Sequence, residues 1–222
     1  MVTEGELGSC AETRGKSDKK TGKAKERFPV TRIYFVRHAQ PDHSWKDDRT
    51  RPLTEEGKTD SKLVLDFLKD KEIHGFYSSP YKRSLDTIAD SAAYFGKEIL
   101  TDERLRERES GPSANNRELF EKRWRDHDYH EEKGESIRMV QERNLAALRE
   151  VLEENRGRNL VVGTHGTALS AVINYYRPEF GLRDYLRILD WMPYVVELDF
   201  AGEELVGIKE HCYVEKEFKG GV

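Results

Sequence analysis

Histidine and arginine side chains lie just beyond three short segments of the sequence that we predict to be strands. They are Arg37 and His38 after residues 32–36, Arg83 after residues 75–79, and His165 after residues 159–163. A guanidinium offers a fork of donors that matches a tetrahedral oxyanion. An imidazole with a pKa near neutrality can act as a nucleophile toward phosphorus, and a second imidazole can stabilise charge on a phosphoryl oxygen. These residue types indicate phosphoryl chemistry.

Acidic side chains follow a further short strand that we predict at residues 98–100. Glu107 and Glu109 come soon after it, and a carboxylic acid can protonate a leaving alkoxide and later take a proton from water. Glu107 stands between Arg106 and Arg108, so a solvated run of charges is the competing interpretation. The sequence shows neither a glycine-rich Walker loop nor clustered metal ligands, so we expect no metal and no cofactor.

Strand and helix patterns alternate along the chain. The apolar runs and turn signals predict strands at residues 32–36, 75–79, 98–100, 159–163, 194–200 and 204–208. Helical spacing and capping signals predict helices from Thr54 to residue 68, from Pro80 to residue 92, at 135–154 and at 167–176. This order predicts an α/β fold, a mostly parallel sheet with helices on both faces. Ligands bind beyond the carboxyl ends of such strands, where the histidines and arginines lie.

Six motifs in this order closely resemble those of the histidine phosphatase superfamily, also called phosphoglycerate mutase-like. They are Val36-Arg37-His38-Ala39, Leu53-Thr54-Glu55-Glu56-Gly57, Ser78-Ser79-Pro80-Tyr81-Lys82-Arg83-Ser84, Leu105-Arg106-Glu107, Gly134-Glu135-Ser136 and Gly163-Thr164-His165-Gly166. The resemblance covers roughly residues 31 to 208 and implies the phosphoglycerate mutase-like fold.

The resemblance also implies a role for each matched residue. His38 is similar to the nucleophile that becomes phosphohistidine, and Glu107 to the acid and base, with Glu109 as the alternative carboxylate. The implied phosphate-binding residues are Arg37, Arg83, His165 and Ser44, the last standing where the family often places Asn. Pro41 replaces the usual Ser or Thr of the same loop.

Three functions remain open at this point. The resemblance favours a metal-independent phosphatase that hydrolyses phosphomonoesters through a phosphohistidine. A phosphoglycerate mutase-type phosphotransferase is the first alternative, but the mutases carry Glu-Arg-His-Tyr-Gly where this chain has Glu107-Arg108-Glu109-Ser110-Gly111. A non-catalytic module that binds a phosphorylated ligand is the second alternative. The expected partner is a small phosphorylated substrate of unidentified structure.

Composition limits the other function classes. The chain has 222 residues, a net charge of −4 and two cysteines, and 36% of its residues are charged. These values predict a cytoplasmic protein that binds neither nucleic acid nor membrane, and they do not indicate its oligomeric state. We expect residues 1–27 to be a disordered leader because they lack aromatic side chains, and residues 28–222 to form the histidine phosphatase domain.

Two further segments flank the expected site. Residues 115–133 combine basic side chains with Phe120 and Trp124, so they either roof the site and bind an anionic substrate or form an ordinary charged helix. We expect Asp42, His43 and Trp45 to form the opposite wall.

Overall fold

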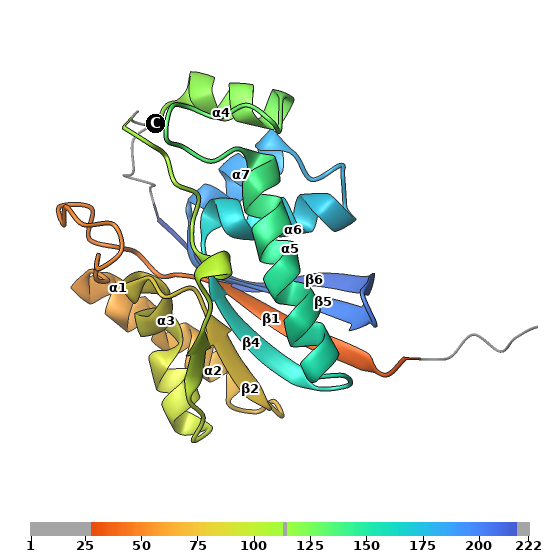
Figure 1. Ribbon diagram of the computed structural model, residues 1–222. Helices are drawn as coiled ribbons and strands as arrows, with labels where there is room; N and C mark the ends of the chain where they lie inside the picture. The colour runs from red at the N-terminus through yellow and green to blue at the C-terminus, as the bar shows by residue number, and fades with distance from the viewer. Residues whose placement is uncertain (1–27, 113–114, 217–222) are drawn as a thin grey trace, which may run out of the picture.

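The centre of the molecule is one mixed sheet (Figure 1). The computed structural model describes residues 28–112 and 115–216, so the expected leader at residues 1–27 lies outside the described residues. The six strands run in the order β3-β2-β4-β1-β5-β6. Their bounds are β1 Val30–Arg37, β2 Gly75–Ser78, β3 Ile99–Thr101, β4 Asn159–Thr164, β5 Trp191–Ala201 and β6 Glu204–Glu215. The first four in spatial order pair in parallel, whereas β5 and β6 pair antiparallel, which confirms the predicted mostly parallel α/β sheet.

Helices cover both faces of this sheet (Figure 1). On one face lie α1 Glu55–Asp60, α2 Lys62–Leu68 and α3 Lys82–Tyr94. On the other face lie α5 Ile137–Glu154, α6 Gly166–Tyr176 and α7 Leu182–Leu189. The short helix α4 Arg117–Arg125 packs beside α7, away from the sheet, and a single 3-10 turn, η1 Glu103–Leu105, follows β3.

The alternation of side chains along β1 builds the two halves of the core. Ile33 and Phe35 pack with α5 and α6 on one face, while Tyr34 and Val36 pack with α2 and α3 on the other. Successive strand residues point to opposite faces, so a continuous apolar run fits a strand that is covered on both sides. Each fully buried side chain of this size stabilises the fold by about 1.5–3 kcal/mol. The core therefore holds the last residue of β1, and the histidine after it, in a fixed position.

The structure differs from the predicted elements in three places. The predicted helix from Thr54 to residue 68 is two helices, because the chain breaks its helical repeat at Ser61. Strands β5 and β6 are longer than the predicted hairpin strands. The helix α7 lies outside the predicted elements, and its Tyr185 and Leu189 pack with Phe120 of α4.

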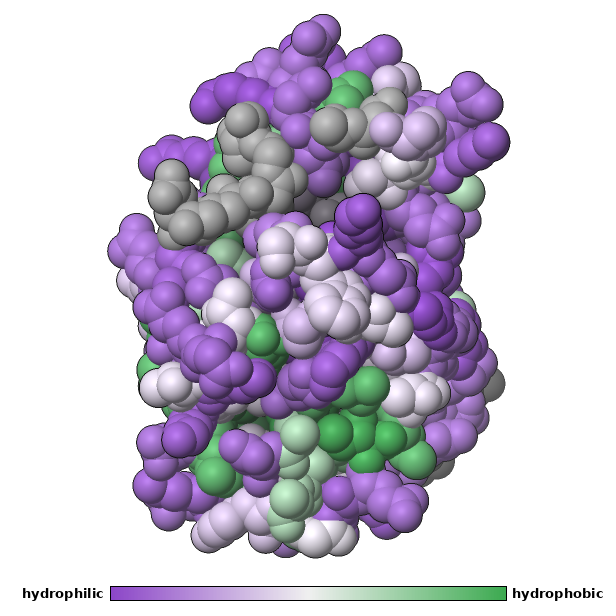
Figure 2. Space-filling view, turned by 90° about the vertical axis from the view of Figure 1, so that its left-hand side faces the viewer, coloured by the Kyte–Doolittle hydropathy of each residue, from purple (hydrophilic) through white to green (hydrophobic). Residues whose placement is uncertain are grey.

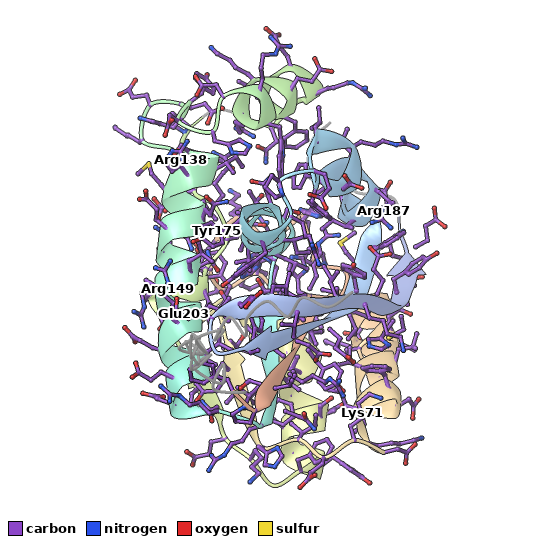
Figure 3. All side chains as sticks on the ribbon, turned by 90° about the vertical axis from the view of Figure 1, so that its right-hand side faces the viewer. Lys71, Arg138, Arg149, Tyr175, Arg187 and Glu203 are labelled. Carbon is purple, nitrogen blue, oxygen red and sulfur yellow. The ribbon has the colours of Figure 1, made fainter. Side chains whose placement is uncertain are left out.

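Polar and charged side chains dominate the face shown in Figure 2, with a smaller hydrophobic area low in the view. Figure 3 shows the opposite side, where Arg149 of α5 lies beside Glu203 of the β5–β6 turn. This pair is an exposed ion pair with Nε and Oε2 3.2 Å apart. Within residues 28–112 and 115–216, no helix has the length and apolar character needed to cross a membrane.

Candidate active site

A cavity of about 710 Å³ lies beyond the carboxyl ends of the parallel strands. Four of the predicted residues line it, namely Arg37, His38, Arg83 and Glu107. The fifth, His165, is fully buried directly behind them, and its ring centroid is 5.2 Å from that of His38. The parallel pairing of β1 with β4 and of β4 with β2 brings these residues together, because all three strands end at one edge.

Arg37 is the last residue of β1 and is almost completely buried. Its Nη1 atom donates to the main-chain oxygens of Leu189 at 2.8 Å and Trp191 at 2.9 Å, and also to that of Ile188. Burial lowers the pKa of Arg37 to about 10, so the guanidinium remains charged at neutral pH. Its Nε atom has no hydrogen-bond partner among the described residues. A buried donor without a partner is costly, and a bound oxyanion would satisfy it.

His38 follows Arg37 and presents one ring nitrogen to the cavity. Its Nδ1 atom lies 2.8 Å from the main-chain oxygen of Ala39, and because a carbonyl only accepts, Nδ1 carries the proton. Nε2 then keeps its lone pair, as a nucleophile requires. Burial, followed by the charges of Arg83 and Arg37, holds the pKa of His38 well below its ordinary range. The imidazole is therefore neutral at neutral pH.

His165 stands at the N-cap position of α6, directly after β4. Its Nε2 atom lies 2.8 Å from the Ser79 hydroxyl, and its buried Nδ1 atom has no partner within the described part of the chain. Burial lowers the pKa of this imidazole too. Strand β4 can lie this close to Ser78 of β2 because residue 163 is glycine. A Cβ at this position would lie 2.7 Å from the Ser78 hydroxyl oxygen.

The Glu107 carboxylate lies at the N-terminus of α6. Oε1 accepts from the main-chain N–H of Arg108 at 2.7 Å and of Ala168 at 3.2 Å, and Oε2 accepts from Thr167 at 3.1 Å. Backbone donors at a helix N-terminus hold an acidic side chain in one place. Glu109 also lines the cavity, but 54% of its side chain is exposed and it pairs with Arg106 at 3.4 Å. The structure therefore favours Glu107 over Glu109 as the acid and base.

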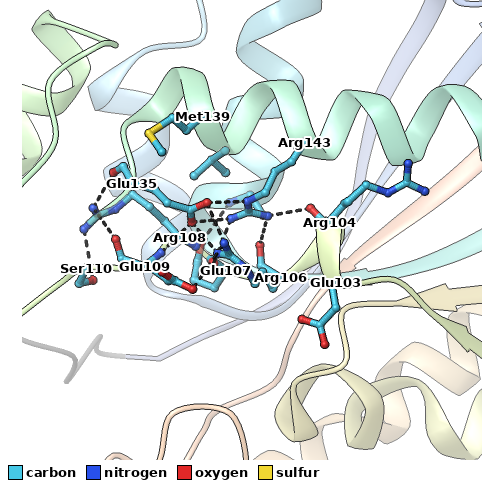
Figure 4. Close-up of polar contacts among 12 residues, drawn as sticks. Glu103, Arg104, Arg106, Glu107, Arg108, Glu109, Ser110, Glu135, Met139 and Arg143 are labelled. Atoms are coloured by element: carbon cyan, nitrogen blue, oxygen red, sulfur yellow. Dashed lines mark hydrogen bonds and ion pairs between the residues drawn. The ribbon is translucent and has the colours of Figure 1, made fainter. Parts of the chain in front are cut away.

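A buried ion network supports the backbone around Glu107 (Figure 4). Arg143 of α5 donates to the main-chain oxygens of Arg104 and Arg106, both at 2.7 Å, and of Glu107 at 3.0 Å. The Glu135 carboxylate accepts from both Arg143 and Arg106 at 2.6–2.9 Å. Although burial opposes it, hydrogen bonding to these arginines lowers the pKa of Glu135 to about 2.

The structure does not place Ser44 with the other predicted phosphate-binding residues. The Ser44 hydroxyl donates to the Asp42 carboxylate at 2.7 Å, and both residues line a separate pocket of about 370 Å³. The hydroxyl is thus bound to Asp42, two residues earlier, and Ser44 does not line the cavity that holds His38. Of the expected opposite wall, His43 lines this cavity, whereas Asp42 and Trp45 do not. Ser44 therefore lies apart from Arg37, His38 and Arg83.

Residues 115–133 contact the cavity at their two ends and pack against α7 between them. Asn115 and Lys133, at the two ends, line the cavity as a roof would. Between them, Phe120 and Trp124 pack against Tyr185 of α7, as in an ordinary amphipathic helix.

Other residues of the site had no distinguishing signal in the sequence. They are Asp48, Arg51, Arg143 and Tyr185. The chain is rich in charged residues, so a single Asp or Arg in a loop does not stand out. Within residues 28–112 and 115–216, no group of three or more His, Cys, Asp or Glu side chains has the geometry to hold a metal ion.

Comparison with known proteins agrees with this geometry. Residues 33–203 match the histidine phosphatase superfamily (branch 1). The chain belongs to this superfamily. The family confirms the resemblance drawn from the six motifs and places the protein among enzymes of the phosphatase and phosphoglycerate mutase type.

Similar proteins include both phosphatases and a mutase-like protein. A relative from Arabidopsis thaliana, "phosphoglycerate mutase-like protein 4", is 30% identical over 168 residues, 66% of this chain and 71% of the relative. A mycobacterial glucosyl-3-phosphoglycerate phosphatase has a TM-score of 0.68 at 17% identity, covering 85% of this chain and 100% of that one. A phosphoserine phosphatase from Entamoeba histolytica, solved with 3-phosphoglyceric acid, has a TM-score of 0.65 at 19% identity, covering 85% and 98%. The two solved structures support the phosphoglycerate mutase-like fold.

Proposed function

We propose that this histidine phosphatase superfamily protein hydrolyses phosphomonoesters without a metal ion, through a phosphohistidine at His38. The observation that carries the proposal is the convergence of Arg37, His38, Arg83 and Glu107 on one cavity, with the His38 Nε2 lone pair free. Arg37 and Arg83 supply positive charge for a phosphate dianion. His165, with a buried unpaired Nδ1 beside the His38 ring, supplies a further polar contact for a phosphoryl oxygen.

The first step forms the phosphohistidine. The His38 Nε2 lone pair attacks phosphorus while the bond from phosphorus to the ester oxygen breaks, and Glu107 gives its proton to the departing alkoxide. Arg37, Arg83 and His165 stabilise the charge on the three equatorial oxygens as it redistributes.

The second step returns the enzyme to its starting state. Glu107, now a carboxylate, takes a proton from water, and the resulting hydroxide attacks phosphorus while the Nε2–P bond breaks. Inorganic phosphate leaves, and the proton remains on Glu107 for the next cycle. The two steps balance without a metal or cofactor, and we propose that the enzyme needs neither.

Turnover of an aryl phosphate in the presence of EDTA tests this proposal. We expect the parent protein to release inorganic phosphate at a rate that EDTA does not change. Because phosphohistidine is stable in alkali and hydrolysed in acid, the reaction is quenched with alkali. The quenched chain should carry covalently bound phosphate that acid releases. His38→Ala should remove both turnover and the trapped phosphate. A folded His38→Ala protein with parental activity would refute the mechanism.

Because the Arabidopsis thaliana relative is a phosphoglycerate mutase-like protein, the experiment must also test for mutase activity. The products of a phosphoglycerate reaction separate the two: a phosphatase releases inorganic phosphate, whereas a mutase returns the isomeric phosphoglycerate. A binding module would bind phosphate and turn over neither compound. Because the Entamoeba histolytica phosphatase was solved with 3-phosphoglyceric acid, the substrate panel should include phosphomonoesters that carry a carboxylate.

A further inference from the structure

The Asp48 carboxylate is bound by the guanidinium of Arg83, which the proposed function assigns to phosphate. Arg83 Nη1 donates to the Asp48 main-chain oxygen at 2.6 Å and to Oδ1 at 3.2 Å, and Nη2 donates to Oδ2 at 3.3 Å. The Arg83 side chain is only 4% exposed, whereas half of the Asp48 side chain is exposed. Both residues line the cavity that holds His38. The fork of Arg83 is therefore already bound to a carboxylate of the same chain.

A second cation binds the same carboxylate. Arg51 Nη1 lies 2.5 Å from Asp48 Oδ1, and Arg51 also lines the cavity. The Arg51 guanidinium also donates to the main-chain oxygen of Trp45, from Nη2 at 3.3 Å and from Nε at 3.4 Å. A carboxylate between two guanidiniums uses the same donors that a phosphate monoester would use. Arg83 and Arg51 thus form an anion-binding site, and the Asp48 carboxylate of the same chain is bound in it.

A phosphate dianion and the Asp48 carboxylate cannot occupy these donors together. They carry charge of the same sign, and their interaction at contact distance is unfavourable. Asp48 lies on the surface loop between β1 and α1, and its exposed half allows the side chain to leave without any change in the sheet. Arg83, by contrast, is fixed by burial. Binding of phosphate then requires that Asp48 withdraw.

We propose that Asp48 is an internal competitor of the substrate phosphate, and that its withdrawal leaves Arg51 as a further phosphate-binding residue beside Arg83. This inference rests on the proposed function, because it takes Arg83 to be a phosphate ligand. It assigns to Asp48 control over how tightly phosphate, as substrate or product, is held. A weaker hold on inorganic phosphate favours its release after each turnover.

Competitive inhibition by inorganic phosphate tests the inference. The inhibition constant is measured against an aryl phosphate for the parent, for Asp48→Asn and for Asp47→Asn. Asp48→Asn removes the charge with little change in size, and we expect the inhibition constant and KM to fall roughly five-fold, about 1 kcal/mol. Asp47→Asn is the matched control: Asp47 is in the same loop and bonds Thr50 and the Arg49 backbone. Its inhibition constant should stay within about two-fold of the parent's, because Asp47 does not line the cavity and forms only exposed hydrogen bonds.

The role of Arg51 has its own comparison. Arg51→Gln in the Asp48→Asn background should raise the phosphate inhibition constant several-fold relative to Asp48→Asn alone. An unchanged constant would remove Arg51 from the proposal. Asp48→Ser serves as a second variant if thermal melting shows that Asp48→Asn is not folded, and it carries the same expectation.

Two results would overturn the role of Asp48. An inhibition constant that does not change in the folded Asp48 variants would show that the carboxylate does not compete. A constant that rises would show instead that Asp48 positions Arg83 for phosphate. Both differ from failure of the proposed function, in which the parent itself neither turns over the aryl phosphate nor binds inorganic phosphate; that result would refute both.

Discussion

At the scale of single residues, the Glu107 carboxyl has the most specific testable role. Glu107→Gln keeps an oxygen for the backbone donors of α6 but cannot give a proton to the leaving group. We expect alkyl phosphates to react roughly 10²–10⁴-fold more slowly, and aryl phosphates, whose phenolic oxygens need little protonation, to slow far less. Single-turnover rates across a series of leaving groups measure this difference. Glu109→Gln is the control, and its rate ratio should stay near one for every leaving group.

A rate ratio for Glu107→Gln that does not vary with the leaving group would contradict its role as the acid. If Glu109→Gln showed the variation instead, the more exposed carboxylate would have that role.

At the scale of elements, α5 positions the segment that carries Glu107. Arg143→Gln removes donors from three main-chain oxygens, including that of Glu107, and leaves the buried Glu135 with fewer partners. We expect the free energy of unfolding to fall by about 2–4 kcal/mol, because these acceptors become unsatisfied away from water. We also expect kcat to fall roughly ten-fold, since a small displacement of a catalytic group slows the reaction. Urea unfolding and steady-state kinetics measure the two effects.

Arg149→Gln is the control on the same helix. Arg149 pairs with Glu203 on the surface, and both side chains are about half exposed or more (Figure 3). Such a pair contributes roughly 0.2–1 kcal/mol, so stability and kcat should stay close to the parent's. Equal losses in the two variants would show that the Arg143 network has no special role.

At the scale of the whole molecule, stability should depend on pH through the two buried imidazoles. Burial holds the pKa values of His38 and His165 well below the ordinary value of about 6.5. Below pH 6.5 the unfolded chain binds more protons than the folded chain, so the free energy of unfolding falls as the pH falls. Each histidine contributes a slope of up to about 1.4 kcal/mol per pH unit between its folded and unfolded pKa values.

Urea unfolding between pH 5 and pH 7 measures this slope, and His165→Gln should reduce it. A free energy of unfolding that is constant over this range would contradict neutral burial of the two rings. Glu135, whose pKa is lowered to about 2, affects stability in a separate pH range. Its contribution to the free energy of unfolding is lost as the pH falls from about 4.5 toward 2.

The sequence by itself determined the sheet, its helical layers and the meeting of Arg37, His38, Arg83 and Glu107 at one cavity. Arg37 ends an apolar strand, His38 and His165 directly follow strands, and Arg83 lies in the first turn of the helix after another strand. Because parallel strands present their carboxyl ends at one edge, local patterns were enough to bring these residues together. The six motifs further restricted the chemistry to that of one superfamily.

The tertiary structure decided what depends on contacts between distant segments. The preference for Glu107 over Glu109 comes from backbone donors of α6, some 60 residues further along the chain. The exclusion of Ser44 and the pairing of Asp48 with Arg83 depend on how one loop folds over the cavity. A sequence pattern records the period of a strand or helix, whereas side-chain direction in a loop is set by its partners in space. For that reason the residues that meet at the cavity were predictable, whereas the pairing of Asp48 with Arg83 was not.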